Sequence, residues 1–132
     1  MESVCLDTGV LIEYFRKKEK KNTFLYRLAA YFGFKVSAIT KYEFERGLKQ
    51  EDAFWEEFFA QTEILPFDGE CAKIASSIYQ KLKKENKLIS ADDILIAATA
   101  ISNELPLANF NVDHFERVDG LKLIRSTDSF EN

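Results

Sequence analysis

Four acidic residues stand at positions from which their carboxylates could share one site. Asp7 directly follows the apolar run Val4-Cys5-Leu6, Glu43 and Asp93 stand at the openings of later helices, and Asp113 follows a late strand. A buried strand that ends in a carboxylate presents it at the carboxyl edge of a parallel sheet, where ligands bind. Carboxylate oxygen and water suit Mg²⁺ or Mn²⁺, whereas one histidine and two distant cysteines argue against Zn²⁺.

Each acid also has a purely structural explanation, and for any one position taken alone that explanation is favoured. Asp7 would cap the helix that follows it. Glu43 lies three residues after Thr40, and Asp93 lies three residues after Ser90, which is the spacing of a capping box. The structural explanation predicts that these carboxylates contact backbone N–H groups, whereas a shared site predicts that they contact a ligand.

The functional explanation is favoured when the four acids are considered together. The strand expected at 106–109 leads to Asn111 and Asp113, which are ordinary turn formers but would lie on the same sheet edge as Asp7. Several carboxylates in one crevice, with no Arg or Lys adjacent in sequence, would repel one another and raise some pKa values unless a cation were bound. The set therefore predicts a cation site.

The elements that must position these residues alternate along the chain. We expect an α/β fold, a three-layer α/β/α domain with a mostly parallel central sheet of four to five strands, built as a single domain over residues 1–132. The expected strands span 3–6, 34–38, 63–66, 106–109 and 121–125, and the expected helices span 9–17, 22–32, 41–49, 51–61, 69–86 and 91–103. The segment 94–98 is apolar all round, so its helix should lie deep against the sheet and hold Asp93 rigidly.

Composition narrows the class of protein. The 132 residues carry a net charge of −4, which argues against a general nucleic-acid coating protein, although Arg16–Lys21 holds five positive residues and one negative one. That basic run is read first as a solvated helix end, with local neutralisation of phosphates as the alternative. The apolar stretches are too short to span a membrane, nothing resembles a secretory signal, and two cysteines favour a reducing cytoplasm.

The chain resembles the PIN domains, in particular the VapC-type toxic ribonucleases of toxin-antitoxin modules. The resemblance covers essentially the whole chain and depends on the order and spacing of its pieces. These pieces are residues 4–12 (VCLDTGVLI), 38–48 (AITKYEFERGL), 90–100 (SADDILIAATA) and 105–121 (LPLANFNVDHFERVDGL).

The resemblance implies which residues form the site. Asp7, Glu43 and Asp93 match the family's principal acids, with Asp7 and Asp93 as the metal ligands, and Thr8 matches the hydroxyl residue that commonly follows the first acid. Asp93 is preferred to Asp92 because it directly precedes the apolar helix, as the family's acid does.

The fourth position departs from the family pattern. Many relatives have Thr-Arg-Asn or Thr-Asn-Asn where this chain has Asn109-Phe110-Asn111, so Asn111 matches the Asn, Phe110 replaces a basic residue, and Asp113 is the nearby carboxylate. His114 is read as a turn or packing residue and not as a general base.

By resemblance, the expected function is that of a Mg²⁺-dependent endoribonuclease, with Mn²⁺ as an alternative cofactor. It would be the toxin of a toxin-antitoxin module, with RNA as substrate, a VapB-like antitoxin as partner and a homodimer as the assembly. Glu43 and Asp113 would position the water. The alternative is a PIN-like domain without catalysis that binds RNA or a protein. A haloacid-dehalogenase-like phosphatase fits poorly, because Gly9 stands where that chemistry expects a second Asp.

Overall fold

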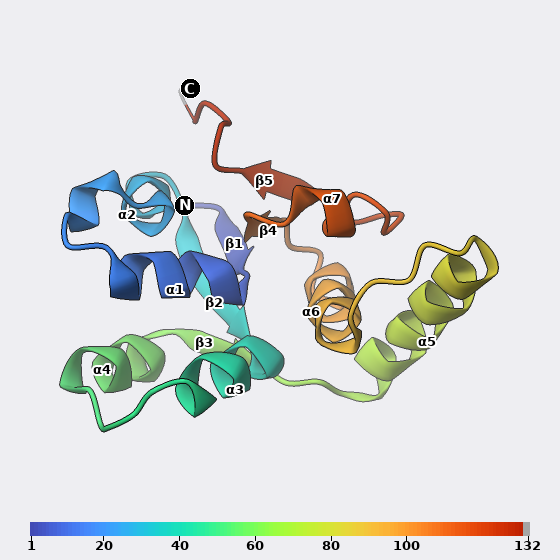
Figure 1. Cartoon of the computed structure of the whole chain (residues 1–132), viewed down its shortest axis with the longest axis horizontal. Coiled ribbons are helices and arrows are strands. Elements are labelled where there is room, and N and C mark those ends of the chain that lie inside the picture. The colour runs from blue at the N-terminus through green and yellow to red at the C-terminus, as the bar shows by residue number, and fades with distance from the viewer. Residues whose placement is uncertain (131–132) are drawn as a thin grey trace.

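Five parallel strands form a central sheet that lies between two groups of helices in the computed structural model (Figure 1), which describes residues 1–130. Residues 131 and 132 of the expected domain lie outside the described part. The strand order is β3-β2-β1-β4-β5, and every neighbouring pair is parallel. The strands are β1 (Ser3–Leu6), β2 (Gly33–Ser37), β3 (Glu63–Leu65), β4 (Leu107–Asn109) and β5 (Leu123–Arg125).

The order of the strands creates one switch point. From β1 the chain moves outward through β2 to β3, and it then returns to the other side of β1 to form β4 and β5. Cys5 and Leu6 of β1 are therefore paired with Leu107 and Ala108 of β4. In open α/β sheets the ligand-binding crevice lies at such a point, outside the carboxyl ends of the two strands. Asp7 directly follows β1, and Asn109 ends β4.

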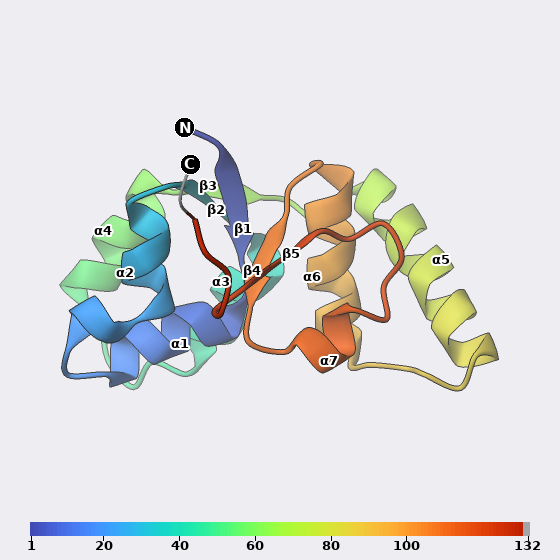
Figure 2. The ribbon, with the colours of Figure 1, turned by 90° about the horizontal axis from the view of Figure 1, so that it is seen from above.

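Helices cover both faces of the sheet, as the view from above shows (Figure 2). Helices α1, α2 and α4 lie on one side, and α5 and α6 lie on the other, whereas α3 follows the end of β2. The helices are α1 (Thr8–Arg16), the 3-10 turn η1 (Lys20–Asn22), α2 (Phe24–Ala29), α3 (Ala38–Arg46), α4 (Ala53–Gln61), α5 (Gly69–Lys84), α6 (Ala91–Ser102) and α7 (Val112–Phe115).

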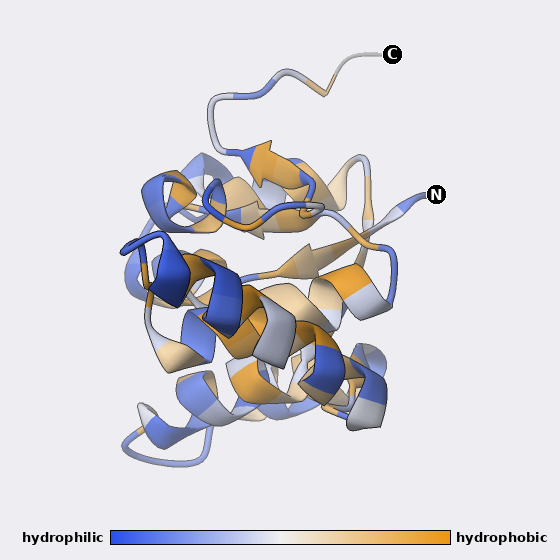
Figure 3. Ribbon diagram, turned by 90° about the vertical axis from the view of Figure 1, so that its right-hand side faces the viewer, coloured by the Kyte–Doolittle hydropathy of each residue, from blue (hydrophilic) through white to orange (hydrophobic). Residues whose placement is uncertain are grey.

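Two apolar clusters fill the spaces between the layers. Successive residues of β1 point to opposite faces, so Val4 and Leu6 pack with α1, α2 and α4, while Cys5 packs with α5 and α6. Figure 3 shows hydrophobic strands in the interior and hydrophilic outer parts on the helices. The helix over 94–98 is deeply packed, because Ile96, Ala97 and Ala98 have no exposed surface.

The predicted fold class is confirmed, but several element boundaries differ. The helix expected over 22–32 divides into η1 and the shorter α2, because Thr23 caps α2 and accepts a hydrogen bond from the Tyr26 N–H. The helix expected over 41–49 begins earlier, at Ala38, because Ser37 is its cap. Helix α7 was not expected. Within residues 1–130, none of the helices has the length and apolar character that a membrane crossing needs.

Candidate active site

Asp7 lies at the centre of the crevice. Its backbone N–H donates to the Ala108 carbonyl oxygen at 3.0 Å, which ties the residue to the neighbouring strand. It occupies the N-cap position of α1, yet its side chain makes no capping hydrogen bond, and the residue is only 8% exposed. Helix capping therefore does not account for this carboxylate.

The surroundings of Asp7 disfavour its negative charge. Burial, together with the charges of Asp93 and Glu43, raises the pKa of Asp7 from 3.8 to about 7. The N–H groups of Thr8 and Gly9 oppose this shift but do not cancel it. A buried carboxylate beside two others is the arrangement that a bound cation would relieve.

Glu43 reaches the site from α3. Its Oε1 accepts a hydrogen bond from the Thr8 hydroxyl at 2.6 Å, and the Thr8 and Thr40 hydroxyl oxygens lie 3.3 Å apart. The capping box proposed for Thr40 and Glu43 is wrong, because the Ser37 hydroxyl caps α3 by accepting from the Thr40 N–H at 3.0 Å. Glu43 is thus free to join α3 to the start of α1.

A second acid lies beside Glu43. Burial raises the pKa of Glu43, the Asp92 carboxyl acts in the same direction, and the Thr8 hydroxyl opposes them. The guanidinium of Arg46 lies 3.9 Å from Glu43 Oε2, although it remains largely exposed. Asp92 therefore belongs to the acidic cluster, facing Glu43.

Asp93 stands in the first turn of α6 and connects to the loop after β4. Its N–H donates to the Ser90 hydroxyl at 3.2 Å, as the capping pattern predicted. Its Oδ2 lies 3.4 Å from the Asn111 side-chain amide and 3.3 Å from His114 Nδ1. Asn111 Nδ2 and His114 Nδ1 are 2.8 Å apart, so Asp93, Asn111 and His114 contact one another.

Asp113 is the one predicted acid that does not interact with the other predicted acids among the described residues. It lies in the first turn of α7 with an exposed side chain. No hydrogen bond or ion pair joins it to another acid within residues 1–130. Its neighbour Asn111 is the member of this segment that contacts Asp93.

Three residues near the acids were not singled out by the sequence. Asp92 was set aside in favour of Asp93, Arg46 was not considered, and His114 was assigned to packing. The adjacent pair Asp92-Asp93 at a helix start was the available signal, because successive residues of a helix point in different directions and can reach different partners. For Arg46 and His114 no local pattern reveals the contact.

The donor set fits Mg²⁺. Asp7, Asp93 and Glu43 offer carboxylate oxygen, and Mg²⁺ is held by one or two carboxylates while it keeps several waters. Within the described residues, no group of three acidic, histidine or cysteine side chains is already gathered around one point. A ligand pair from Asp7 and Asp93, completed by water, is consistent with both observations.

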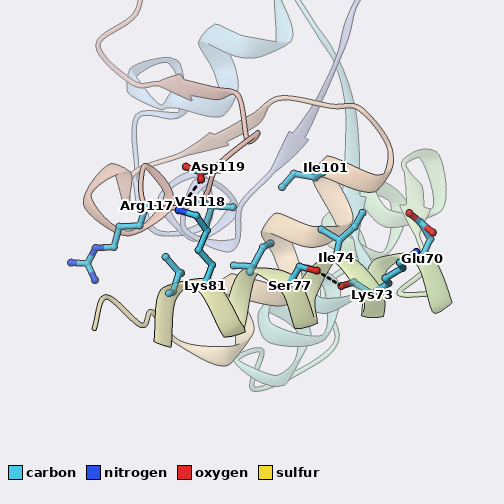
Figure 4. Close-up of a pocket in the computed structure, with 11 residues that line it drawn as sticks. Glu70, Lys73, Ile74, Ser77, Lys81, Ile101, Arg117, Val118 and Asp119 are labelled. Atoms are coloured by element: carbon cyan, nitrogen blue, oxygen red, sulfur yellow. Dashed lines mark hydrogen bonds and ion pairs between the residues drawn. The ribbon is translucent and has the colours of Figure 1, made fainter. Parts of the chain in front are cut away.

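A partly apolar cavity lies elsewhere. It has a volume of about 310 Å³, lies along α5 and the loop at 117–119, and is lined in part by Lys81 and Asp119, which pair at 2.9 Å (Figure 4). Its lining contains none of the four predicted acids. Carboxylate chemistry therefore has its place at the strand ends and not along α5.

Comparisons with known proteins concern the family and the fold of the chain. The family model for the PIN domain matches residues 4–121. Ribonuclease VapC1 of Methanocaldococcus jannaschii is 40% identical over 127 residues, which cover 91% of this chain and 85% of the relative.

Two solved structures share the fold. The DNA-bound VapBC from Salmonella typhimurium aligns with a TM-score of 0.81 at 24% identity, covering 96% of this chain and 99% of that one. A toxin-antitoxin complex from Klebsiella pneumoniae aligns with a TM-score of 0.76 at 22% identity, covering 96% and 100%.

Proposed function

This chain belongs to the PIN domain family, with a VapC ribonuclease as a 40% identical relative, and we propose that it is a Mg²⁺-dependent endoribonuclease, the toxin of a toxin-antitoxin module. One observation carries the metal-dependent chemistry: the buried Asp7 carboxylate lies beside Asp93 and Glu43 at the switch point of the sheet, with its pKa raised to about 7.

The residues divide into two roles in this proposal. Asp7 and Asp93 would hold Mg²⁺, which stabilises negative charge on the phosphate oxygens and makes water a better nucleophile. Glu43 accepts from Thr8 through Oε1, and its other oxygen, Oε2, would position a water. Asn111 holds the Asp93 carboxylate in place through its side-chain amide.

Asp113 is the proposed fourth acid, acting on the water together with Glu43. Its position in the first turn of α7, two residues after Asn111, supports this role. The exposed side chain would have to turn toward the crevice when RNA and metal bind. Loss of cleavage in Asp113→Asn supports the assignment, and full activity of that variant removes Asp113 from the site.

The proposed partner is a VapB-like antitoxin, in keeping with the toxin-antitoxin complex that shares this fold. An Arg side chain from such a partner suits the crevice, because a guanidinium binds a carboxylate through two parallel hydrogen bonds and can replace a metal ion. A cytoplasmic location and a homodimer complete the proposal.

Expression in growing cells tests the function directly. We expect the wild type to arrest growth and to produce discrete new RNA 5′ ends, and we expect Asp7→Ala to abolish both effects. Glu63→Gln is the matched control, because Glu63 begins β3 and its partner is Lys35. If Asp7→Ala arrests growth as strongly as the wild type does, the proposed function is wrong.

Purified protein tests the metal assignment. Wild type should cleave a sensitive RNA only when Mg²⁺ or Mn²⁺ is added, and Asp93→Asn should lose about 100-fold or more in rate, in the range seen when a charge-stabilising group is removed. Full Mg²⁺-dependent activity in Asp93→Asn would show that the ligand assignment is wrong.

A domain that binds RNA or a protein without catalysis is the alternative. The exposed Asp113 and the lack of a ready-made group of three ligands among residues 1–130 favour it. Titration calorimetry separates the two: binding of Mg²⁺ supports the enzyme, and RNA binding without any Mg²⁺ binding supports the alternative.

A further inference from the structure

An aromatic ring lies next to the acidic crevice. Phe110 occupies the bend between β4 and α7, directly before Asn111, and is 44% exposed. Its Cδ2 stands 3.8 Å from the point that a Cβ on Gly9 would occupy, and the Asp7 Oδ2 stands 4.0 Å from that same point. Because Gly9 has no side chain, no Cβ stands between the ring and the carboxylate, which both border the same point above Gly9.

Packing alone explains only one side of this ring. Phe110 contacts Phe24, with the ring centroids 5.4 Å apart. Phe24 is itself only 2% exposed and also stacks against Phe130. A phenylalanine that leaves almost half of its surface in water gains less stability from burial than the same residue placed inside the core.

The chemistry of the ring indicates what it binds. A phenyl ring cannot neutralise a phosphate, but it offers an apolar face on which a nucleobase can stack. Such a base must be unpaired, because bases within a duplex are already stacked on their neighbours. Because the ring and the Asp7 carboxylate border the same point above Gly9, the base would belong to a nucleotide close to the bond that is cut.

Other exposed rings fit this role less well. Tyr42 precedes Glu43, but the guanidinium of Arg46 already lies 5.1 Å from the centre of its ring. Tyr79 has the same exposed fraction as Phe110, 44%, and lies on α5, on the opposite side of the sheet from α1. Tyr79 is therefore a suitable control for the loss of an exposed ring.

We propose that Phe110 is a base-stacking residue of the active site, on whose ring an unpaired base beside the scissile phosphodiester stacks. This inference rests on the proposed ribonuclease function. The Phe110 ring would contact a base of the RNA, whereas a basic residue at the same position would contact the RNA phosphate backbone.

The test uses single-stranded oligoribonucleotides that span a cleavage site mapped in cells. Phe110→Leu should raise KM by about 10-fold or more with little change in kcat, since stacking stabilises the bound substrate and the transition state alike. Phe110→Tyr should restore the wild-type KM, and Tyr79→Leu should leave it unchanged. The same RNA annealed to its complement should be a poor substrate.

Abasic nucleotides separate stacking from a structural effect. Removing the base at one position beside the cleaved bond should weaken binding to the wild type as much as Phe110→Leu does, and should not weaken binding to Phe110→Leu any further. A fluorescent purine analogue at that position should be quenched by the wild type and by Phe110→Tyr only. Thermal unfolding of each variant reports any general loss of structure.

The outcomes distinguish the two proposals. If the wild type cleaves the RNA but Phe110→Leu has an unchanged KM, or if every abasic position affects both proteins equally, the stacking role is wrong and the ribonuclease remains. If the wild type cleaves none of these RNAs with Mg²⁺, the proposed function itself fails.

Discussion

At the scale of single residues, the buried Asp7 carboxylate makes the stability of the fold depend on pH. Its pKa is raised from 3.8 to about 7, so the protonated form favours folding and the charged form opposes it. This contribution to stability is complete below pH ~4, and it is lost as the pH rises through ~7. The metal-free protein is therefore destabilised at and above neutral pH.

We predict that Asp7→Asn stabilises the protein at pH ~8 in EDTA by about 2 to 4 kcal/mol, because each unit of pKa corresponds to ~1.4 kcal/mol. The difference from the wild type should shrink as the pH falls toward ~4. Urea unfolding over this pH range measures both effects. The exposed Asp113→Asn is the control and should show neither.

Added Mg²⁺ provides the complementary measurement. It should raise the Tm of the wild type at pH ~8, because a ligand that binds only the folded state stabilises it. Asp7→Asn should respond much less. Equal shifts in the two proteins would place the metal at other residues.

At the scale of elements, the cap of α6 affects both the stability of the helix and the position of Asp93, a proposed metal ligand. The Ser90 hydroxyl accepts from the Asp93 N–H at 3.2 Å, and α6 continues into a helix whose Ile96 is fully buried. Because the middle of α6 is fixed by packing in the core, the order of its first turn, which contains Asp93, depends on the Ser90 cap.

We predict that Ser90→Ala lowers the free energy of unfolding by about 1 kcal/mol, as expected for loss of an N-cap, and also lowers the cleavage rate. Asp52→Ala is the matched variant, because Asp52 caps α4 by accepting from the Phe54 N–H at 3.0 Å. It should cost similar stability without changing the rate. If Ser90→Ala and Asp52→Ala have equal free energies of unfolding and also equal cleavage rates, the cap of α6 has no effect on catalysis.

At the scale of the whole molecule, the strand order concentrates function at one place. Strands β1 and β4 are neighbours only because the chain reverses direction across the sheet between β3 and β4. The net charge of −4 is a separate property of the whole molecule. It is compatible with a nucleic-acid substrate, provided that a cation offsets the charge of the acids where the phosphate binds.

The homodimer is a prediction at the same scale. Light scattering of the purified protein should give about twice the chain mass of 15.2 kDa. A monomer at high concentration would remove the dimer from the proposal while leaving the single-chain chemistry intact.

Local patterns determined a large part of this fold. Apolar runs bounded by turn residues located all five strands to within about two residues, and the buried helix after Asp93 was predicted from its uniform apolar character. The early start of α3 was missed because Ser37 and Thr40 are both acceptable caps, and the choice depends on where β2 stops pairing with its neighbours. The short α7 has too few residues for a periodic pattern.

The sequence by itself determined which carboxylates end strands or begin helices, and hence that Asp7, Glu43 and Asp93 could face one edge of a sheet. Only the tertiary structure decided how they are paired: Glu43 with Thr8 and Asp92, and Asp93 with Asn111 and the charge of Asp7. The physical reason is distance along the chain. Residues 35 positions apart, such as Thr8 and Glu43, meet only when strand order and the packing of both helix layers have been settled by the whole core.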